Sequence, residues 1–132
     1  MPDMLAQGSA WLEDQRHAHM TRPVVYERGG ETIEVLATIG RTLFEVVDAS
    51  GGIMQKLESR DFLVRTVDLI LGGRPALPKP ADRIRETNGE QVFVYEVMTP
   101  LGGNEPPFRY SDPNRRTLRI HTKHIGTEAI AS

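Results

Sequence analysis

The chain has 132 residues, which fits one domain with a sizeable core and leaves little room for two. Charged residues make up 26% of it and the net charge is −2, which argues against a strongly basic nucleic-acid binder, while the lack of cysteine excludes disulfides, thiolate chemistry and a Cys-ligated zinc site. No apolar run approaches the roughly 18 residues of a membrane span and the N-terminus lacks a signal-peptide pattern, so we expect a soluble protein made in the cytoplasm, without a membrane partner.

The first segment, residues 3–20, has the clearest helical pattern in the chain. Apolar positions such as Leu5, Trp11 and Leu12 recur at three- and four-residue steps, and Pro23 ends the pattern. We therefore predict an N-terminal α-helix over residues 3–20. Trp11 is expected to anchor this helix to the core, and a contact with a neighbouring subunit is the alternative.

After the proline the pattern changes from helical to alternating. Residues 24–28 and 31–39 flank Gly29-Gly30, which predicts a hairpin with a tight turn. On the second strand, one face is expected to carry the apolar side chains of Ile33, Val35, Ala37 and Ile39. Gly40 is expected to break the strand before a separate β segment at residues 42–47.

The middle of the chain alternates between loops and short β segments. Residues 48–52, which include Ser50, Gly51 and Gly52, are predicted to form a flexible loop, because these residue types favour turns. Two β segments follow at residues 53–59 and 61–66. The proline-rich residues 72–80 are expected to cross the surface in an extended form.

Residues 82–97 carry the strongest hairpin signal in the chain. Asn88-Gly89 is predicted at the centre of a two-residue type I′ turn, because both residues tolerate a positive φ. The second strand is apolar on both faces, with Val92 and Val94 on one and Phe93, Tyr95 and Val97 on the other. We therefore expect a central strand, followed by an irregular loop at residues 99–107.

The densest basic cluster lies in residues 108–125. Its cations, set against the single acid Asp112, are Arg109, Arg115, Arg116, Arg119 and Lys123. Alternation predicts a last strand with one apolar face, carrying Leu118, Ile120 and Thr122, and one basic face, carrying Arg119, His121 and Lys123. That basic face is either a solvated surface or a surface for nucleic acid or an acidic partner. Residues 126–132 are predicted to form a loose tail.

Catalytic and metal-binding motifs were sought in the sequence and rejected. The glycine pairs lack the lysine and hydroxyl residues of a phosphate loop and are interpreted as turns. The histidines fall in two near pairs, His17/His19 and His121/His124, whose spacing suits no bidentate metal site. Carboxylates such as Glu58 and Asp61 have no reason to converge in a pocket. We therefore predict no catalytic, cofactor-binding or metal-binding residues, and no enzyme.

The elements together predict a single domain over residues 1–132. Its fold class is mainly β: a small antiparallel β-barrel or sandwich at residues 23–125, with the N-terminal α-helix at 3–20 and the tail at 126–132. We expect its function to be assembly rather than chemistry.

Several of these stretches resemble one protein family. They are Phe62-Leu63-Val64-Arg65-Thr66, Asp82-Arg83-Ile84, with Ala81 in place of the usual glycine, Phe93-Val94-Tyr95-Glu96-Val97, and residues 110–123. With the helix and the Ser-Gly-Gly loop, their layout resembles the head–tail joining, or stopper, proteins of long-tailed bacteriophages. These are small β-barrel proteins that form a ring between the head's connector and the tail.

The resemblance implies a structural virion protein of the phage neck, made in the host cytoplasm. It implies a homo-oligomeric, hexameric ring that meets portal or adaptor proteins on the head side and tail terminator or tail-tube proteins on the tail side, and that helps retain packaged DNA in its channel. Loops 48–55 and 99–107 are expected to make contacts along the axis. The candidates for subunit or DNA-channel contacts are Trp11, Ser50, Gly51, Gly52, Arg109, Arg115, Arg116, Arg119 and Lys123.

Other functions stay open at this point. One is a tail terminator or another neck or tail protein, and another is a small hydrolase or nucleotide-binding enzyme. A third is a stand-alone OB-like nucleic-acid-binding module, although the aromatic platform typical of single-strand binders is missing from the basic strand.

Overall fold

The computed structural model describes residues 21–47, 51–100 and 105–130. This part of the chain is mainly β, as predicted, and the predicted helix at 3–20 lies outside it. The strands are β1 Arg22–Arg28, β2 Glu31–Val47, β3 Ile53–Arg65, β4 Ile70–Leu71, β5 Arg74–Pro75, β6 Arg83–Asn88, β7 Gln91–Val97, β8 Phe108–Tyr110 and β9 Thr117–Ala129, with a 3₁₀ turn at Thr66–Asp68.

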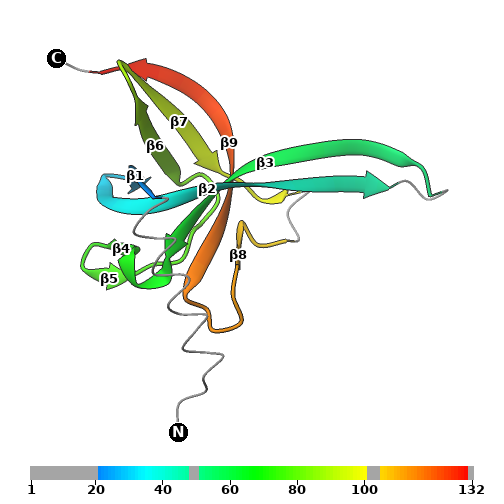
Figure 1. Cartoon of the computed structure of the whole chain (residues 1–132), viewed down its shortest axis with the longest axis horizontal. Helices are drawn as coiled ribbons and strands as arrows, with labels where there is room; N and C mark the ends of the chain where they lie inside the picture. The colour runs from blue at the N-terminus through cyan, green and yellow to red at the C-terminus, as the bar shows by residue number, and fades with distance from the viewer. Residues whose placement is uncertain (1–20, 48–50, 101–104, 131–132) are drawn as a thin grey trace, which may run out of the picture.

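Seven strands form one sheet in the order β3-β2-β1-β6-β7-β9-β8, and every pairing is antiparallel. β3 also pairs with β9, so the pairings run from β3 through β2, β1, β6, β7 and β9 and return to β3. β4 and β5 form a separate two-stranded sheet. Figure 1 shows β9 passing through the middle of the molecule, with β7 and β8 on either side of its course.

The inward faces of these strands form one hydrophobic core. Its largest fully buried apolar side chains are Tyr26, Phe62, Leu69, Ile84, Leu118 and Ile120. On β9, the buried Leu118 and Ile120 confirm the predicted apolar face of the last strand. All of these residues except Leu69 lie on strands, where the two-residue repeat places their side chains on the inner face, and Leu69 reaches the core from the residue between the 3₁₀ turn and β4.

The first hairpin is confirmed. Arg28 pairs with Glu31 across Gly29-Gly30, and Gly29 has a φ of 60°, which glycine adopts at little cost. Val35 and Ala37 are buried on the predicted inner face of β2, and Ile33 and Ile39 pack against the core.

The second hairpin forms, but its turn lies one residue later than predicted. Asn88 pairs with Gln91, so the two central residues of the turn are Gly89 and Glu90. Gly89 has a φ of 63° and Glu90 does not have a positive φ, so only the first central position is in the left-handed region, as in a type II′ turn, whereas type I′ needs a positive φ at both. Asn88 instead remains in the ladder as the last residue of β6.

The predicted break at Gly40 is wrong. β2 runs without interruption from Glu31 to Val47, and β3 joins the two β segments predicted at 53–59 and 61–66. An added Cβ at Gly40 would lie 2.9 Å from the Arg119 side chain and 3.1 Å from that of Leu63. The glycine is therefore part of the strand and makes room for close packing on it.

The C-terminal strand is longer than predicted. β9 continues past residue 125 to Ala129, and Ala129 pairs with Gln91. Residues 126–129 are therefore strand rather than loose tail, because β7 offers them a free edge to pair with. β7 itself pairs with β6 on one side and β9 on the other, which confirms the prediction of a central strand.

Candidate functional site

The most distinctive feature of the fold is an extension of β2 and β3 beyond the rest of the sheet. β1 pairs with β2 only as far as Ala37, and β9 pairs with β3 only from Arg60 onward. We call residues 41–47 and 53–59 the arm, because over these residues β2 and β3 pair, within the described part of the chain, only with one another. Figure 1 shows this two-stranded ribbon leaving the body of the protein.

One face of the arm carries charges around a single exposed leucine. Leu43 is 56% exposed. Arg41 Nε lies 3.6 Å from Glu58 Oε1, and Lys56 Nζ lies 4.0 Å from Glu45 Oε1. Ion pairs this long between exposed side chains contribute little to stability, so these groups remain available to another surface.

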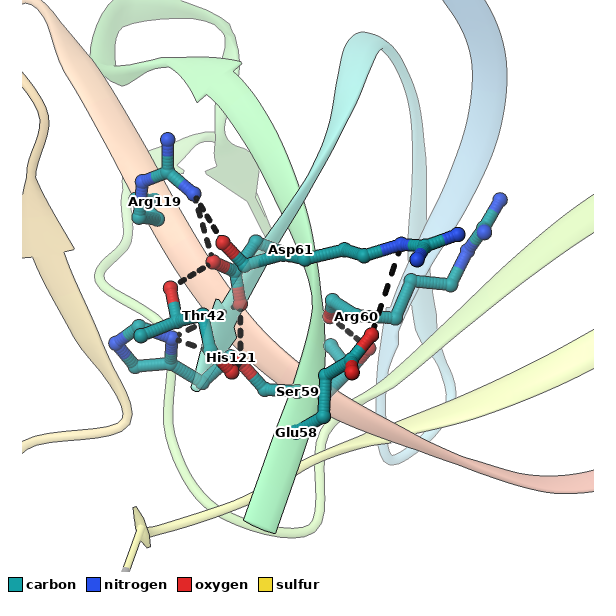
Figure 2. A network of polar contacts seen from close by, with 9 residues as sticks. Thr42, Glu58, Ser59, Arg60, Asp61, Arg119 and His121 are labelled. Carbon is teal, nitrogen blue, oxygen red and sulfur yellow. Dashed lines mark hydrogen bonds and ion pairs between the residues drawn. The ribbon is translucent and has the colours of Figure 1, made fainter. Parts of the chain in front are cut away.

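A buried carboxylate, that of Asp61, fixes the base of the arm. The side chain of Asp61 is fully buried and accepts hydrogen bonds from four donors. Ser59 Oγ lies 2.5 Å and His121 Nδ1 3.0 Å from its Oδ1, and Arg119 Nη1 lies 2.8 Å from its Oδ2. Thr42 Oγ1 also donates to Oδ2. Figure 2 shows these side chains converging on Asp61 from β2, β3 and β9.

These contacts keep Asp61 ionised. Burial by itself would raise the pKa of the carboxyl group, but the hydrogen bonds from His121, Ser59, Thr42 and Arg119 outweigh it and hold the pKa well below its ordinary value. An ionised, fully satisfied carboxylate at this point connects both strands of the arm to β9.

Arg119 and His121 make the connection on the β9 side. Arg119 Nη1 also donates to the backbone oxygen of Arg41, at 3.4 Å, and its side chain passes over Gly40. The ring of His121 meets Phe44 of the arm edge-on, with centroids 5.1 Å apart. The arm is therefore held in a defined direction relative to the body.

The opposite face of β3 carries a second ionic cluster. Arg60 points away from Asp61 (Figure 2) and donates to both carboxylate oxygens of the buried Glu86, at 2.9 and 2.7 Å. Its guanidinium also lies 5.1 Å from the ring centre of Tyr95, and Arg22 donates to Glu86 at 2.9 Å. Arg60 and Asp61, which are neighbours in the chain, thus form ion pairs on opposite faces of β3.

A third cluster is centred on Asp82. Tyr26 donates its hydroxyl hydrogen to Asp82 Oδ2, and Arg28 Nη2 lies 2.8 Å from the same oxygen. The backbone N–H of Lys79 donates to it at 3.0 Å. Burial, reinforced by the hydrogen bond to Asp82, raises the pKa of Tyr26 far above its ordinary value. This cluster connects β1 to the segment that leads into β6.

Strand β8 and the turn that follows it present three exposed arginines, Arg109, Arg115 and Arg116, which we call the cationic turn. The carboxylate of the nearby Asp112 accepts hydrogen bonds from backbone N–H groups, including that of Thr117 at 2.9 Å. Arg115 has a φ of 56°, uncommon for a residue with a side chain, and its guanidinium lies 5.5 Å from the ring centre of Tyr110. Asp112 thus shapes the turn through the backbone.

The other predicted contact residues are distributed over the molecule. Trp11 and Ser50 lie outside the described residues, whereas Gly51 and Gly52 are exposed beside the arm, directly before β3. Lys123 is exposed on β9 opposite Glu96. Arg119 was predicted to share the open basic face, but in the structure it pairs with Asp61, because β3 lies beside this part of β9 and brings the carboxylate to it.

Sequence reasoning missed the group around Asp61. It placed His121 on the basic face and found no reason for Asp61 to meet another polar residue, yet both are buried and in contact. The only local signal was Ser59 and Asp61 two residues apart, which puts both side chains on one face of a strand. Nothing local pointed to their partners on β9.

The described part of the chain offers no group of three or more His, Asp or Glu side chains arranged to hold a metal ion. Its helical content includes nothing long and apolar enough to cross a membrane. An open groove of about 680 Å³ lies beside β4 and β5, lined by residues that include Arg28, Glu31, Leu71, Arg74, Leu77 and Lys79.

The fold and the arm define an antiparallel, mainly β protein with a projecting hairpin. Residues 2–129 match the protein family described as phage head-tail joining protein, and the chain belongs to that family. The family is one of structural proteins and implies a component of the virion, in agreement with the resemblance found in the sequence. Comparisons with curated proteins and with solved structures gave no match.

Proposed function

We propose that this chain is a subunit of a ring at the neck of the phage particle. In this proposal six copies join the portal or adaptor on the head side to the tail terminator or tail tube on the tail side, and the ring helps retain the packaged DNA. The observation that carries the proposal is membership of the joining family in a fold whose arm extends beyond its own sheet. An arm of that kind suits contact with another subunit.

The body and its loops have distinct roles in the proposed ring. The circuit of strands that returns from β9 to β3 acts as the β-barrel body of the subunit. Residues 48–55, with Ser50, Gly51 and Gly52, and residues 99–107 make contacts along the ring axis. Trp11 contacts a neighbouring subunit.

In this proposal the exposed cations contact the DNA. Arg115, Arg116 and Lys123 are exposed, and none of them forms the ion pair with Asp61 that occupies Arg119, so each can reach a phosphate. Arg119 is not assigned to DNA, because removing it from Asp61 would leave a buried carboxylate without a cation. The contacts retain DNA without reading its sequence, as phosphate contacts do.

The test is a phage that lacks this chain, with the chain resupplied from a plasmid. We expect filled heads that lose their DNA and separate, complete tails in its absence, and normal particles on resupply. Imaging of the complemented particle should show density for this chain as a ring between portal and tail. Heads that keep their DNA beside tails of uncontrolled length would instead indicate a tail terminator.

The cationic turn favours a second candidate, a stand-alone nucleic-acid-binding module. One of its arginines, Arg115, lies beside Tyr110, an aromatic ring of the kind on which a base can stack. That function predicts tight binding of the isolated protein to short DNA, weakening steeply as salt is added. Binding that is weak in isolation, combined with density at the neck, would leave the joining function as the better account.

A further inference from the structure

The end of the β6–β7 hairpin carries the only Asn-Gly pair of the sequence, Asn88-Gly89. Asn88 is the last residue of β6, and Gly89 is the first central residue of the turn. Both residues are exposed, and a Cβ added at Gly89 would meet nothing within 4 Å. Within the described part of the chain, no hydrogen bond holds the side-chain amide of Asn88. Water and the neighbouring backbone can therefore both reach this amide.

An asparagine followed by glycine can lose its side-chain amide without a catalyst, because glycine has no Cβ to obstruct the approach of its backbone nitrogen. In this reaction the nitrogen of Gly89 forms a bond to Asn88 Cγ, and the bond from Cγ to Nδ2 breaks. The proton given up by the Gly89 nitrogen leaves with Nδ2 as ammonia. One water molecule then opens the five-membered ring at either carbonyl, which gives aspartate or isoaspartate without oxidation or reduction.

The strand ladder opposes this reaction while the hairpin is closed. Asn88 pairs with Gln91, so its backbone is extended and its side chain stands away from the direction of the chain. In this position Asn88 Cγ is not aligned with the nitrogen of Gly89. The reaction therefore requires the end of the hairpin to open.

The end of the hairpin is held by few contacts. β1 pairs with β6 only at residues 83–85, and beyond that point β6 pairs, among the described residues, only with β7. On the other side of β7, the last contacts are the pairing of Gln91 with Ala129 and a hydrogen bond of 3.2 Å from the Ile130 N–H to the Glu90 oxygen. Frayed ends of this kind open at a free energy well below that of global unfolding.

We propose that Asn88 is a site of spontaneous deamidation in the folded protein, reached through opening of this hairpin end. The isoaspartate product lengthens the backbone by one carbon, so residue 88 can no longer pair in register with Gln91. Its carboxylate also adds a negative charge two residues from Glu90. Both changes loosen the contacts of Ala129 and Ile130 at the end of β9. The inference concerns the chain itself and does not depend on the proposed ring.

The first test follows residue 88 by mass while the purified full chain is held at mildly alkaline pH, where the Gly89 nitrogen loses its proton more readily. Digestion after glutamate releases the peptide 87–90, in which deamidation adds about 1 Da. Asn114 is the matched control, because it is also exposed but is followed by Arg115. We expect Asn88 to react at least about tenfold faster than Asn114. Equal rates would overturn the proposal.

A comparison of the folded and unfolded chain tests the requirement for opening. The ladder is absent in guanidinium chloride, so Asn88 should react at least about threefold faster there than in the folded protein. Equal rates in the two states would overturn the role given to the hairpin end. A residue 88 that reacts only in the unfolded chain would overturn its assignment as a site in the folded protein.

Hydrogen exchange measures the consequence of the modification. In the aged protein, residues 91 and 129–130 should exchange faster than in fresh protein, whereas the core residues Leu118 and Ile120 should not change. The control is Asn88→Gln, aged in parallel, because glutamine would have to close a larger ring. Since residue 88 is exposed, this variant should fold like the parent and keep its slow exchange. Unchanged exchange in the deamidated parent would overturn the loosening of β9.

Discussion

Arg119 of β9 donates a hydrogen bond to the buried carboxylate of Asp61 on β3, with 2.8 Å between Nη1 and Oδ2. The same nitrogen reaches the backbone of Arg41, so one side chain joins the last strand of the body to both strands of the arm. The direction of the arm relative to the body therefore depends on this ion pair and its hydrogen-bonding neighbours.

Replacing Asp61 is expected to be costly. In Asp61→Asn the charge is lost and Arg119 and His121 face a neutral amide that offers its own N–H groups, so the free energy of unfolding should fall by about 2–4 kcal/mol. Urea denaturation measures this change. The control Glu58→Gln, on the exposed arm face, should change stability by no more than about 0.5 kcal/mol. Equal effects of the two substitutions would contradict the central role of Asp61.

Asp61 also predicts an acid dependence of stability. Its pKa in the folded state lies below the ordinary value of 3.8, so the stability it contributes is fully present above that pH and is lost as the pH falls toward the depressed pKa. The free energy of unfolding of the parent protein should therefore decline below about pH 4 more steeply than that of Asp61→Asn. Parallel curves for the two proteins would show that the pKa of Asp61 is the same in the folded and unfolded states, and would contradict the stabilising contacts assigned to its carboxylate.

Gly40 is expected to tolerate no side chain. In Gly40→Ala the new methyl group would lie 2.9 Å from Arg119 Nη1 and 3.1 Å from Leu63, and Arg119 cannot retreat without weakening its contact with Asp61. A loss of about 1–3 kcal/mol in unfolding free energy should result. Gly30→Ala is the matched control, because nothing lies within 4 Å of its added Cβ. Thermal unfolding should show a lower midpoint for Gly40→Ala alone.

Tyr26 supports the body of the protein through Asp82. Tyr26→Phe leaves the ring in the core and removes only the hydroxyl donor, while Arg28 and the Lys79 N–H still satisfy the carboxylate, so we expect a loss of about 1–2 kcal/mol. Because the pKa of Tyr26 is raised from 10.0, the parent protein should also lose stability as the pH rises above 10. Denaturation at alkaline pH should show a smaller loss in Tyr26→Phe.

The two hairpins show how much of a turn's position can be predicted from the residues of the turn itself. Gly29-Gly30 placed the first turn correctly, because glycine is the residue best suited to the positive φ of such turns. Asn88-Gly89 placed the second turn one residue early, because Asn-Gly suits a type I′ turn while Gly89 equally suits the first central position of a type II′ turn, and the pairing of Asn88 with Gln91 selects the second register. At Gly40 local preference favoured a break, whereas pairing with β3 on one side and packing against Arg119 on the other keep the strand continuous.

The sequence by itself determined that the protein is built mainly from strands, which side chains form the inner faces of β2 and β9, and the family to which the chain belongs. Tertiary structure alone decided that β9 closes onto β3, that Asp61 meets Arg119 and His121, and that residues 41–47 and 53–59 extend as an arm. A two-residue repeat fixes the face on which a side chain lies, but it carries no information about which distant strand lies beside it. The partners of Asp61, 58 and 60 residues further along the chain, follow only from the long-range pairing of β3 with β9.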